Sequence, residues 1–152
     1  MANTQAMCTS FMGELLTGTH NFTPSTGDTF NAALYLTTAT VNASTTAYSA
    51  TGEVSGANYT GGGVAVTNAN APASTNSSST AGVAYWTPSA GITYSNVTLS
   101  TAFDAVLIYN SSKSNKAVSV HTFGAQTITA GTFTLTMPTN NTVSALLRIS
   151  TT

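Results

Sequence analysis

The stretch of sequence that decides the fold is TAFDAVLIYNSSKSNKAVSVHTFG, from Thr101 to Gly124. Its first part, Ala102 to Tyr109, carries apolar side chains on both faces at a period of two. A short run of this kind, rich in Val, Ile and Tyr, is typical of a strand that is covered on both sides. The polar residues Asn110 to Asn115 predict a turn, and Lys116 to Phe123 predicts a second strand. We therefore expect a long antiparallel hairpin at the centre of the core.

Further short strands are expected around this hairpin. Alternating or short apolar runs predict them at Phe30–Thr37, Val64–Thr67, Val83–Trp86, Ile92–Leu99, Gln126–Ile128, Thr132–Met137 and Ala145–Ile149. In one of these runs the apolar period slips at Ser95 and Asn96, which predicts a β-bulge. Many short strands separated by turn signals are typical of an all-β domain. We predict that residues 1–152 form a single domain, a two-sheet antiparallel β-sandwich of jelly-roll type with one short N-terminal helix.

The helix is expected over residues 4–18. Apolar side chains recur there at every fourth position, at Met7, Phe11 and Leu15. Thr4 is the expected N-cap and Gly18 the expected stop, while Gly13 weakens the helix by about 1 kcal/mol relative to Ala. Two interpretations stay open. The helix either covers an open end of the β core or serves as a docking arm on a neighbouring subunit.

Two long polar segments interrupt the strand pattern. Residues 38–63 contain three consecutive glycines near their end, and Val54 and Tyr59 are the expected anchors of this loop. Residues 68–80 have the lowest complexity in the chain and are expected to be mobile without a partner. Loops of this length in a small domain are usually interaction surfaces or disordered segments.

The chain is very poor in charge. It has three basic and four acidic residues and a net charge of −1, so that 5% of its residues are charged. A soluble domain ordinarily has about 25%. Three basic residues cannot neutralise enough phosphates to bind nucleic acid or an anionic membrane surface. A surface with so little charge tends to associate, which favours a protein that is covered by a partner.

The cysteine content and the apolar segments indicate where the chain folds. The single Cys8 excludes an intramolecular disulfide and a cysteine-based zinc site. No apolar run approaches the length of a membrane span, and the N-terminus lacks the positive region of a secretory signal. We expect the chain to fold in a cytoplasm.

No residue pattern points to catalysis, a cofactor or a metal. His20 and His121 are isolated in the sequence, and the four carboxylates are scattered singly. Asp104 lies inside the apolar strand, where it either faces water or pairs with Lys113, Lys116 or Arg148. We expect no enzyme activity.

The aromatic residues allow one binding function. They could line a sugar-binding groove, although ordinary packing in the core and at its rim is the better explanation for them. These residues are Tyr48, Tyr59, Tyr85, Trp86 and Tyr94.

Several phrases of the sequence resemble a group of small structural proteins of tailed bacteriophages. They are MCTSFMGELLTGTHNF (Met7 to Phe22), AYSATGEVSG (Ala47 to Gly56), LIYNSSKSNKAV (Leu107 to Val118), TFTLTMPT (Thr132 to Thr139) and LLRI (Leu146 to Ile149). Members of similar size often are capsid decoration, or cement, proteins: β-sandwich or jelly-roll subunits that bind the major capsid shell as symmetric oligomers. The group has no catalytic motif, so no site residues carry over from it.

The resemblance implies a head decoration protein made in the host cytoplasm and located on the capsid surface. Its expected partners are the major capsid protein and copies of itself, as a dimer or trimer. The alternatives are another virion part, from the tail, the neck or a head fibre, and a carbohydrate-binding adhesin. The residues expected to contact a partner are Phe11, Leu15, Val54, Tyr59 and Trp86.

Overall fold

The fold, seen in a computed structural model that describes residues 2–75 and 82–151, consists mainly of β-strands. Along the chain the elements are β1 (Ala6–Met7), α1 (Thr9–Leu16), β2 (Phe30–Leu36), β3 (Val64–Ala65), β4 (Ala73–Ser74), β5 (Val83–Trp86), β6 (Ile92–Asn110), β7 (Lys116–Leu135) and β8 (Leu147–Ser150). They form a five-stranded sheet in the order β1-β7-β6-β2-β3 and a three-stranded sheet in the order β4-β5-β8. All strand pairs are antiparallel. The prediction of a β-rich chain with two antiparallel sheets and one short helix is confirmed.

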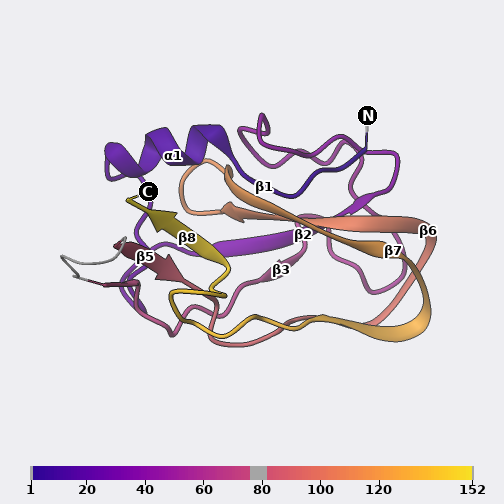
Figure 1. The fold of residues 1–152 in the computed structure, drawn as a ribbon. Coiled ribbons are helices and arrows are strands. Elements are labelled where there is room, and N and C mark those ends of the chain that lie inside the picture. The colour runs from indigo at the N-terminus through magenta and orange to yellow at the C-terminus, as the bar shows by residue number, and fades with distance from the viewer. Residues whose placement is uncertain (1, 76–81, 152) are drawn as a thin grey trace.

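The hairpin of β6 and β7 is the largest element, and it is longer than predicted. The sequence predicted two strands within β6 and three within β7, but 19 and 20 residues respectively form continuous strands. In Figure 1 the hairpin folds back on itself at the right of the view, so that its halves lie above and below β2 and β3. Tyr94 lies near the start of β6, in the half of the hairpin that is remote from its turn. Its hydroxyl donates a hydrogen bond of 2.8 Å to the carbonyl oxygen of Ala32 in β2.

Bulges explain why the sequence predicted several shorter strands in place of β6 and β7. The register of the β6–β7 pair shifts at several points, including one between Tyr94 and Val97, where a bulge was predicted. Asn96 and Ala130 have positive φ angles of 51° and 46°. Each bulge shifts the alternation of side chains without ending the strand, and it bends the hairpin locally. Where the alternation of apolar and polar residues is interrupted, the strand therefore bends and continues, although we expected it to end there.

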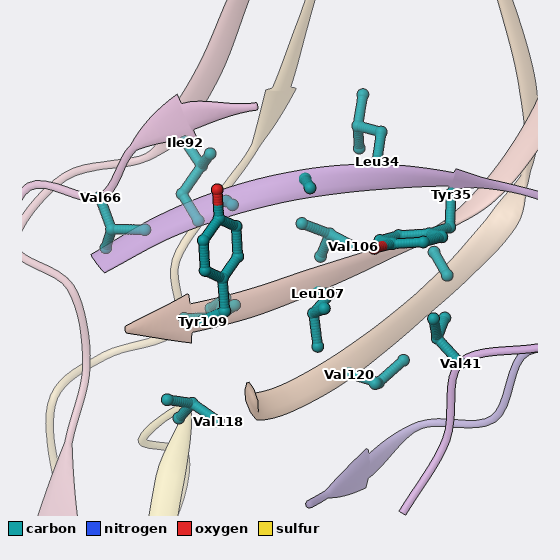
Figure 2. Close-up of a cluster of buried hydrophobic side chains, with 14 of the residues drawn as sticks. Leu34, Tyr35, Val41, Val66, Ile92, Val106, Leu107, Tyr109, Val118 and Val120 are labelled. Carbon is teal, nitrogen blue, oxygen red and sulfur yellow. The ribbon is translucent and has the colours of Figure 1, made fainter. Parts of the chain in front are cut away.

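The core lies where β2 pairs with the second half of β6, from Phe103 to Asn110. Both faces of β6 are buried from Ala105 to Asn110, as the apolar run predicted. The centre of β2, from Ala32 to Tyr35, is buried as well. Figure 2 shows Tyr35, Val106 and Tyr109 among the buried side chains that fill the space around these two strands. A strand covered on both faces gains apolar burial at every residue, which makes this pair the best-buried part of the described chain.

The N-terminal segment is shorter in helix than predicted. Residues 6–7 pair with β7 at Val120 and Ser119, so the helix begins only at Thr9, with Cys8 in place of Thr4 at the N-cap. The strand pairing accounts for this difference, because backbone groups bound to β7 cannot also form a helical turn. The predicted stop at Gly18 is confirmed. The N–H of Gly18 bonds to Leu15 and the N–H of Thr19 to Glu14, which is a Schellman motif.

The two long loops differ in how the structure describes them. Residues 37–63 contain no regular element, as predicted, but isolated bridges connect them to the large sheet at Tyr35–Glu53, Ala47–Lys116 and Ala57–Thr98. Within the predicted loop 68–80, Ala73–Ser74 forms β4 on the edge of the small sheet. The remainder of that prediction, residues 76–81, lies outside the described residues.

Candidate docking site

Aromatic rings connect helix α1 to the small sheet. The ring of Phe11, the one buried residue of α1, lies 5.9 Å from the ring of Phe22. Phe22 stacks on Phe30 of β2 at 4.4 Å and lies 4.7 Å from Trp86 of β5. The indole N–H of Trp86 donates to Asn68 and to the backbone oxygen of Asn70, both at 3.0 Å. The cluster fixes the position of α1, because moving the helix would disturb several ring contacts.

Beside this cluster lies an apolar pocket. It has a volume of about 510 Å³ and is enclosed by α1, by residues 18–23 and by strands β5 and β8. Phe11 and Leu15 of the helix face Leu147 and Ile149 of β8 across it, and Trp86 contributes a further wall. Figure 1 shows α1 and β8 as neighbours at the upper left of the view. Three of the five predicted contact residues thus meet in one pocket: Phe11, Leu15 and Trp86.

The surface next to the pocket is also apolar. Leu16, at the end of α1, has an exposed fraction of 90%, and Met12 one turn earlier has 47%. Ile149, on the opposite wall of the pocket, is 48% exposed. Exposed apolar residues that stand together mark binding surfaces more often than single ones do. Trp86 contributes little to the surface itself, since only 3% of it is exposed and its ring is not accessible for stacking on a sugar.

Glu14 holds the pocket's helix in place. The helix places this carboxylate between the ammonium group of Lys116 in β7 and the ring of His20, whose Nε2 lies 2.7 Å from Oε2. Partial burial by itself would raise the pKa of the Glu14 carboxyl, but the hydrogen bonds from Lys116 and His20 outweigh it and hold the pKa below its usual value of 4.5. The residue is therefore charged at neutral pH and joins three segments that are distant in sequence.

The buried amide of Asn110 determines the state of His20. Its Nδ2 donates at 2.8 Å to the carboxylate of Asp28, which can only accept, and lies 3.0 Å from Nδ1 of His20. The His20 Nδ1 is consequently an acceptor without a proton, and Nε2 carries the proton that it donates to Glu14. Both ring nitrogens are occupied, which leaves none to act as a general base or as a metal ligand. The hydrogen bonds of this arrangement hold the helix, the following loop and the hairpin together.

Asp28 completes this network on the hairpin side. Its carboxylate accepts from the backbone N–H of Asn21 and from Asn110, and Lys113 lies 3.6 Å away. Burial alone would raise the pKa of Asp28, but these hydrogen bonds and the charge of Lys113 lower it below its usual value of 3.8. We refer to Glu14, His20, Asp28, Asn110 and Lys116 as the polar clamp.

The other histidine and the cysteine of the described residues lie outside the polar clamp. Within residues 2–75 and 82–151, no three His, Cys, Asp or Glu side chains are grouped as metal ligands would be. His121 contacts Ser119 at 2.9 Å, and burial lowers the pKa of His121 to about 4. Cys8 is fully buried, and burial, together with the charge of Glu14, raises the pKa of its thiol to about 11. No described helix is both long and apolar enough to cross a membrane.

The other two predicted contact residues lie in a different place. Val54 is buried and its N–H bonds to Leu34 of β2, while the Tyr59 hydroxyl accepts from the N–H of Leu34 at 3.0 Å. Tyr59 also donates to Glu53 at 2.8 Å, and Tyr48 donates to the same carboxylate at 2.6 Å. Desolvation raises the pKa of Tyr59, and so does the bond to Glu53. These residues anchor loop 37–63, as predicted, and they do not line the pocket.

Asp104 has a different neighbour from those that the sequence proposed. The side-chain amide of Asn3 donates to its carboxylate at 2.6 Å and to the backbone oxygen of Leu36 at 2.9 Å. Among the described residues no ion pair with Lys113, Lys116 or Arg148 forms, because both lysines bind acids of the polar clamp. Asn3 thereby attaches the N-terminal segment to the outside of the large sheet.

The sequence did not predict the polar clamp or the far wall of the pocket. Glu14, Asp28 and Asn110 are separated by long intervals, and only the pairing of β6 with β7 and β2 brings them together. One signal was present. Asn110 stands directly after the apolar run and is the last residue of β6, where a polar residue that is fully buried needs partners.

Comparisons with known proteins found no match: no family model, no curated protein and no solved structure is similar to this chain.

Proposed function

We propose that this protein is a capsid decoration protein of a bacteriophage, which binds the outer surface of the major capsid shell and stabilises it. The observation that carries the proposal is the apolar pocket between α1 and the small sheet, with Leu16 and Ile149 exposed beside it. The resemblance of the sequence phrases to small virion proteins supplies the identity of the partner. The proposal includes the fold type: the two antiparallel sheets form a β-sandwich of the jelly-roll type.

The chemistry of the surface supports binding over catalysis. Burying a Leu side chain contributes about 1.5–3 kcal/mol, and the pocket accepts an apolar side chain without desolvating a free charge. Among the described residues no Asp, Glu, Lys or Arg side chain lines the pocket, and Glu14, on the helix that lines it, is already paired with Lys116. A capsid protein that inserts an apolar side chain here would meet a preformed site held rigid by the polar clamp.

Mass action explains how such binding would stabilise a shell. A protein that binds only the assembled state stabilises that state by RT ln(1 + [L]/Kd), about 2.7 kcal/mol per site when its concentration is a hundred times Kd. The symmetry of a capsid repeats this gain at many sites. The proposal includes self-association as a dimer or trimer.

The test is thermal melting of capsids of the phage that encodes the protein, depleted of it and then reconstituted. Wild-type protein is expected to raise the melting temperature of the capsids and to saturate a fixed number of sites. Ile149→Asp is expected to weaken binding about tenfold or more, because Ile149 is exposed and lines the pocket, so that the substitution places a charge on the docking surface. Val143→Asp is the matched control, since Val143 is also exposed, at 76%, but does not line the pocket.

Two outcomes would contradict the proposal. One is an unchanged melting temperature with no saturable binding. The other is a native copy number near a dozen per particle, in place of hundreds, which would assign the protein to the tail or neck.

A further inference from the structure

The outer edge of β7 is open over most of its length. One edge of β7 pairs with β6, while on the other edge β1 covers only Ser119 and Val120. From residue 121 to residue 135, no described strand pairs with this second edge. Backbone N–H and C=O groups along such an edge are available to a further strand, as in any sheet that ends in an unpaired strand.

Side chains do little to protect this edge. Proteins usually block long edge strands with charged residues or proline. Here no Asp, Glu, Lys or Arg occurs between Lys116 and Arg148, and the first proline is Pro138, after β7 has ended. The exposed side chains near the middle of the segment are uncharged: Ala125, Gln126, Thr127, Thr129 and Ala130. The register shifts of the β6–β7 pair bend the strand, but they add no charge that would repel a neighbour.

The sequence of this edge is partly palindromic, since three of its six mirror pairs are identical. In TFGAQTITAGTFT, Thr122 to Thr134, Ile128 stands at the centre with a threonine on each side. Phe123 and Phe133 are at equal distances from the centre, and so are the terminal threonines. The positions between them are mostly small, occupied by Gly or Ala. Antiparallel pairing about a twofold axis brings each residue opposite its mirror position, so a palindromic strand pairs like with like.

We propose that two copies of this chain pair through their β7 edges, antiparallel, about a twofold axis at Ile128. Thr127 then lies opposite Thr129 of the partner subunit, and Phe123 lies opposite Phe133 of the partner subunit. The pairing joins two five-stranded sheets into one continuous sheet. It uses a surface distinct from the docking pocket and requires no capsid.

The two phenylalanines support a second copy as the occupant. Their rings lie 5.2 Å apart within one chain, because the hairpin bends between them, and Phe133 is also 5.2 Å from the buried Phe103. Both remain only half-buried, so the apolar interior reaches the surface at this edge. Another copy would cover these rings with the same pair of rings, since a bend centred on the axis is preserved by the twofold rotation.

The experiment is sedimentation analysis of the full chain over a concentration series, with pairs of charges placed on the edge. Wild-type protein is expected to form a dimer. Thr127→Lys with Thr129→Lys puts like charges opposite each other twice, and it is expected to raise the dimer dissociation constant about tenfold or more. Thr127→Lys with Thr129→Glu puts opposite charges together at the same positions, and it is expected to restore the dimer.

The controls separate pairing from folding. Thr93→Lys with Ser100→Lys changes two exposed residues of the neighbouring strand β6 and is expected to leave the dimer intact. All variants should keep the wild-type circular dichroism spectrum. A wild-type monomer at every concentration would overturn the proposal, and so would a trimer, or a dimer that the two lysines do not weaken.

Discussion

At the scale of single residues, one glycine decides how loop 37–63 joins the sheet. Gly63 has a φ angle of 75°, and a Cβ atom there would lie 1.7 Å from the carbonyl oxygen of Ala32. The chain therefore passes directly against the backbone of β2 before it enters β3. Gly61, two residues earlier, has no such constraint, because the nearest atom to its Cβ position is 4.0 Å away.

We predict that Gly63→Ala lowers the free energy of unfolding by about 2–4 kcal/mol, through the strained φ angle and the backbone clash. Gly61→Ala is expected to change it by less than about 1 kcal/mol. Urea unfolding of the three proteins measures both. Equal effects of the two substitutions would show that the close approach to Ala32 does not exist.

The sequence predicted which residues anchor loop 37–63, but it did not predict which residues they contact. Val54 and Tyr59 were correctly expected to anchor their loop, since apolar side chains within a polar segment have few other uses. Their partner, Leu34, was not predictable, and neither was the bond between Asn3 and Asp104. Such contacts depend on a three-dimensional arrangement that no local pattern encodes.

At the scale of elements, α1 shows how local signals and tertiary pairing compete. Its end was predictable, because Gly18 adopts the left-handed conformation that a Schellman motif requires. Its start was not, because the pairing of residues 6–7 with β7 replaces the first predicted turn. The same competition merged the predicted short strands into β6 and β7, where bulges kept the strands continuous.

Two glycines, Gly13 within α1 and Gly18 just after its end, should respond in opposite directions to substitution by alanine. Gly13→Ala is expected to stabilise the protein by about 0.5–1 kcal/mol, because the position is exposed, helical and open around its Cβ site. Gly18→Ala is expected to destabilise it by about 1 kcal/mol, because φ is 66° there. Thermal unfolding of both variants tests this. A change of the same sign in both would contradict the assigned helix end.

At the scale of the whole molecule, four of the seven charged residues belong to one network. These four, Glu14, Asp28, Lys113 and Lys116, hold helix, loop and hairpin together. Both carboxyl groups have a pKa that lies lower in the folded protein than in the unfolded chain. Their contribution to stability is therefore complete above the unfolded pKa, and it is lost as the pH falls through the folded one.

We predict that the melting temperature begins to fall below about pH 6.5, because His121 takes up a proton in the unfolded chain but not in the folded protein, and that it falls further below the ordinary glutamate pKa of 4.5. At pH 7, Glu14→Gln should cost about 1–3 kcal/mol, since it leaves Lys116 and His20 with a weaker acceptor. The melting curves of variant and wild type should converge as the pH approaches 3. A difference that does not change with pH would mean that the charge of Glu14 is unimportant.

The overall architecture was predictable to the level of β-rich layers and one helix. Thr, Ser and Gly content, the turn signals and the apolar strand after Thr101 were sufficient for that. The pocket was predictable only in part. Phe11, Leu15 and Trp86 were expected to contact a partner, but the opposite wall, Leu147 and Ile149, became visible only when β8 was placed beside α1.

The scarcity of basic residues has a practical consequence for proteolysis. Trypsin cleaves after lysine and arginine, and this chain offers it only Lys113, Lys116 and Arg148. The two lysines sit at the tight turn of the central hairpin, with their side chains bound to acids. The folded protein should thus survive digestion that degrades ordinary proteins. After denaturation it should release all of β7 except Lys116 within one long peptide, Ala117 to Arg148.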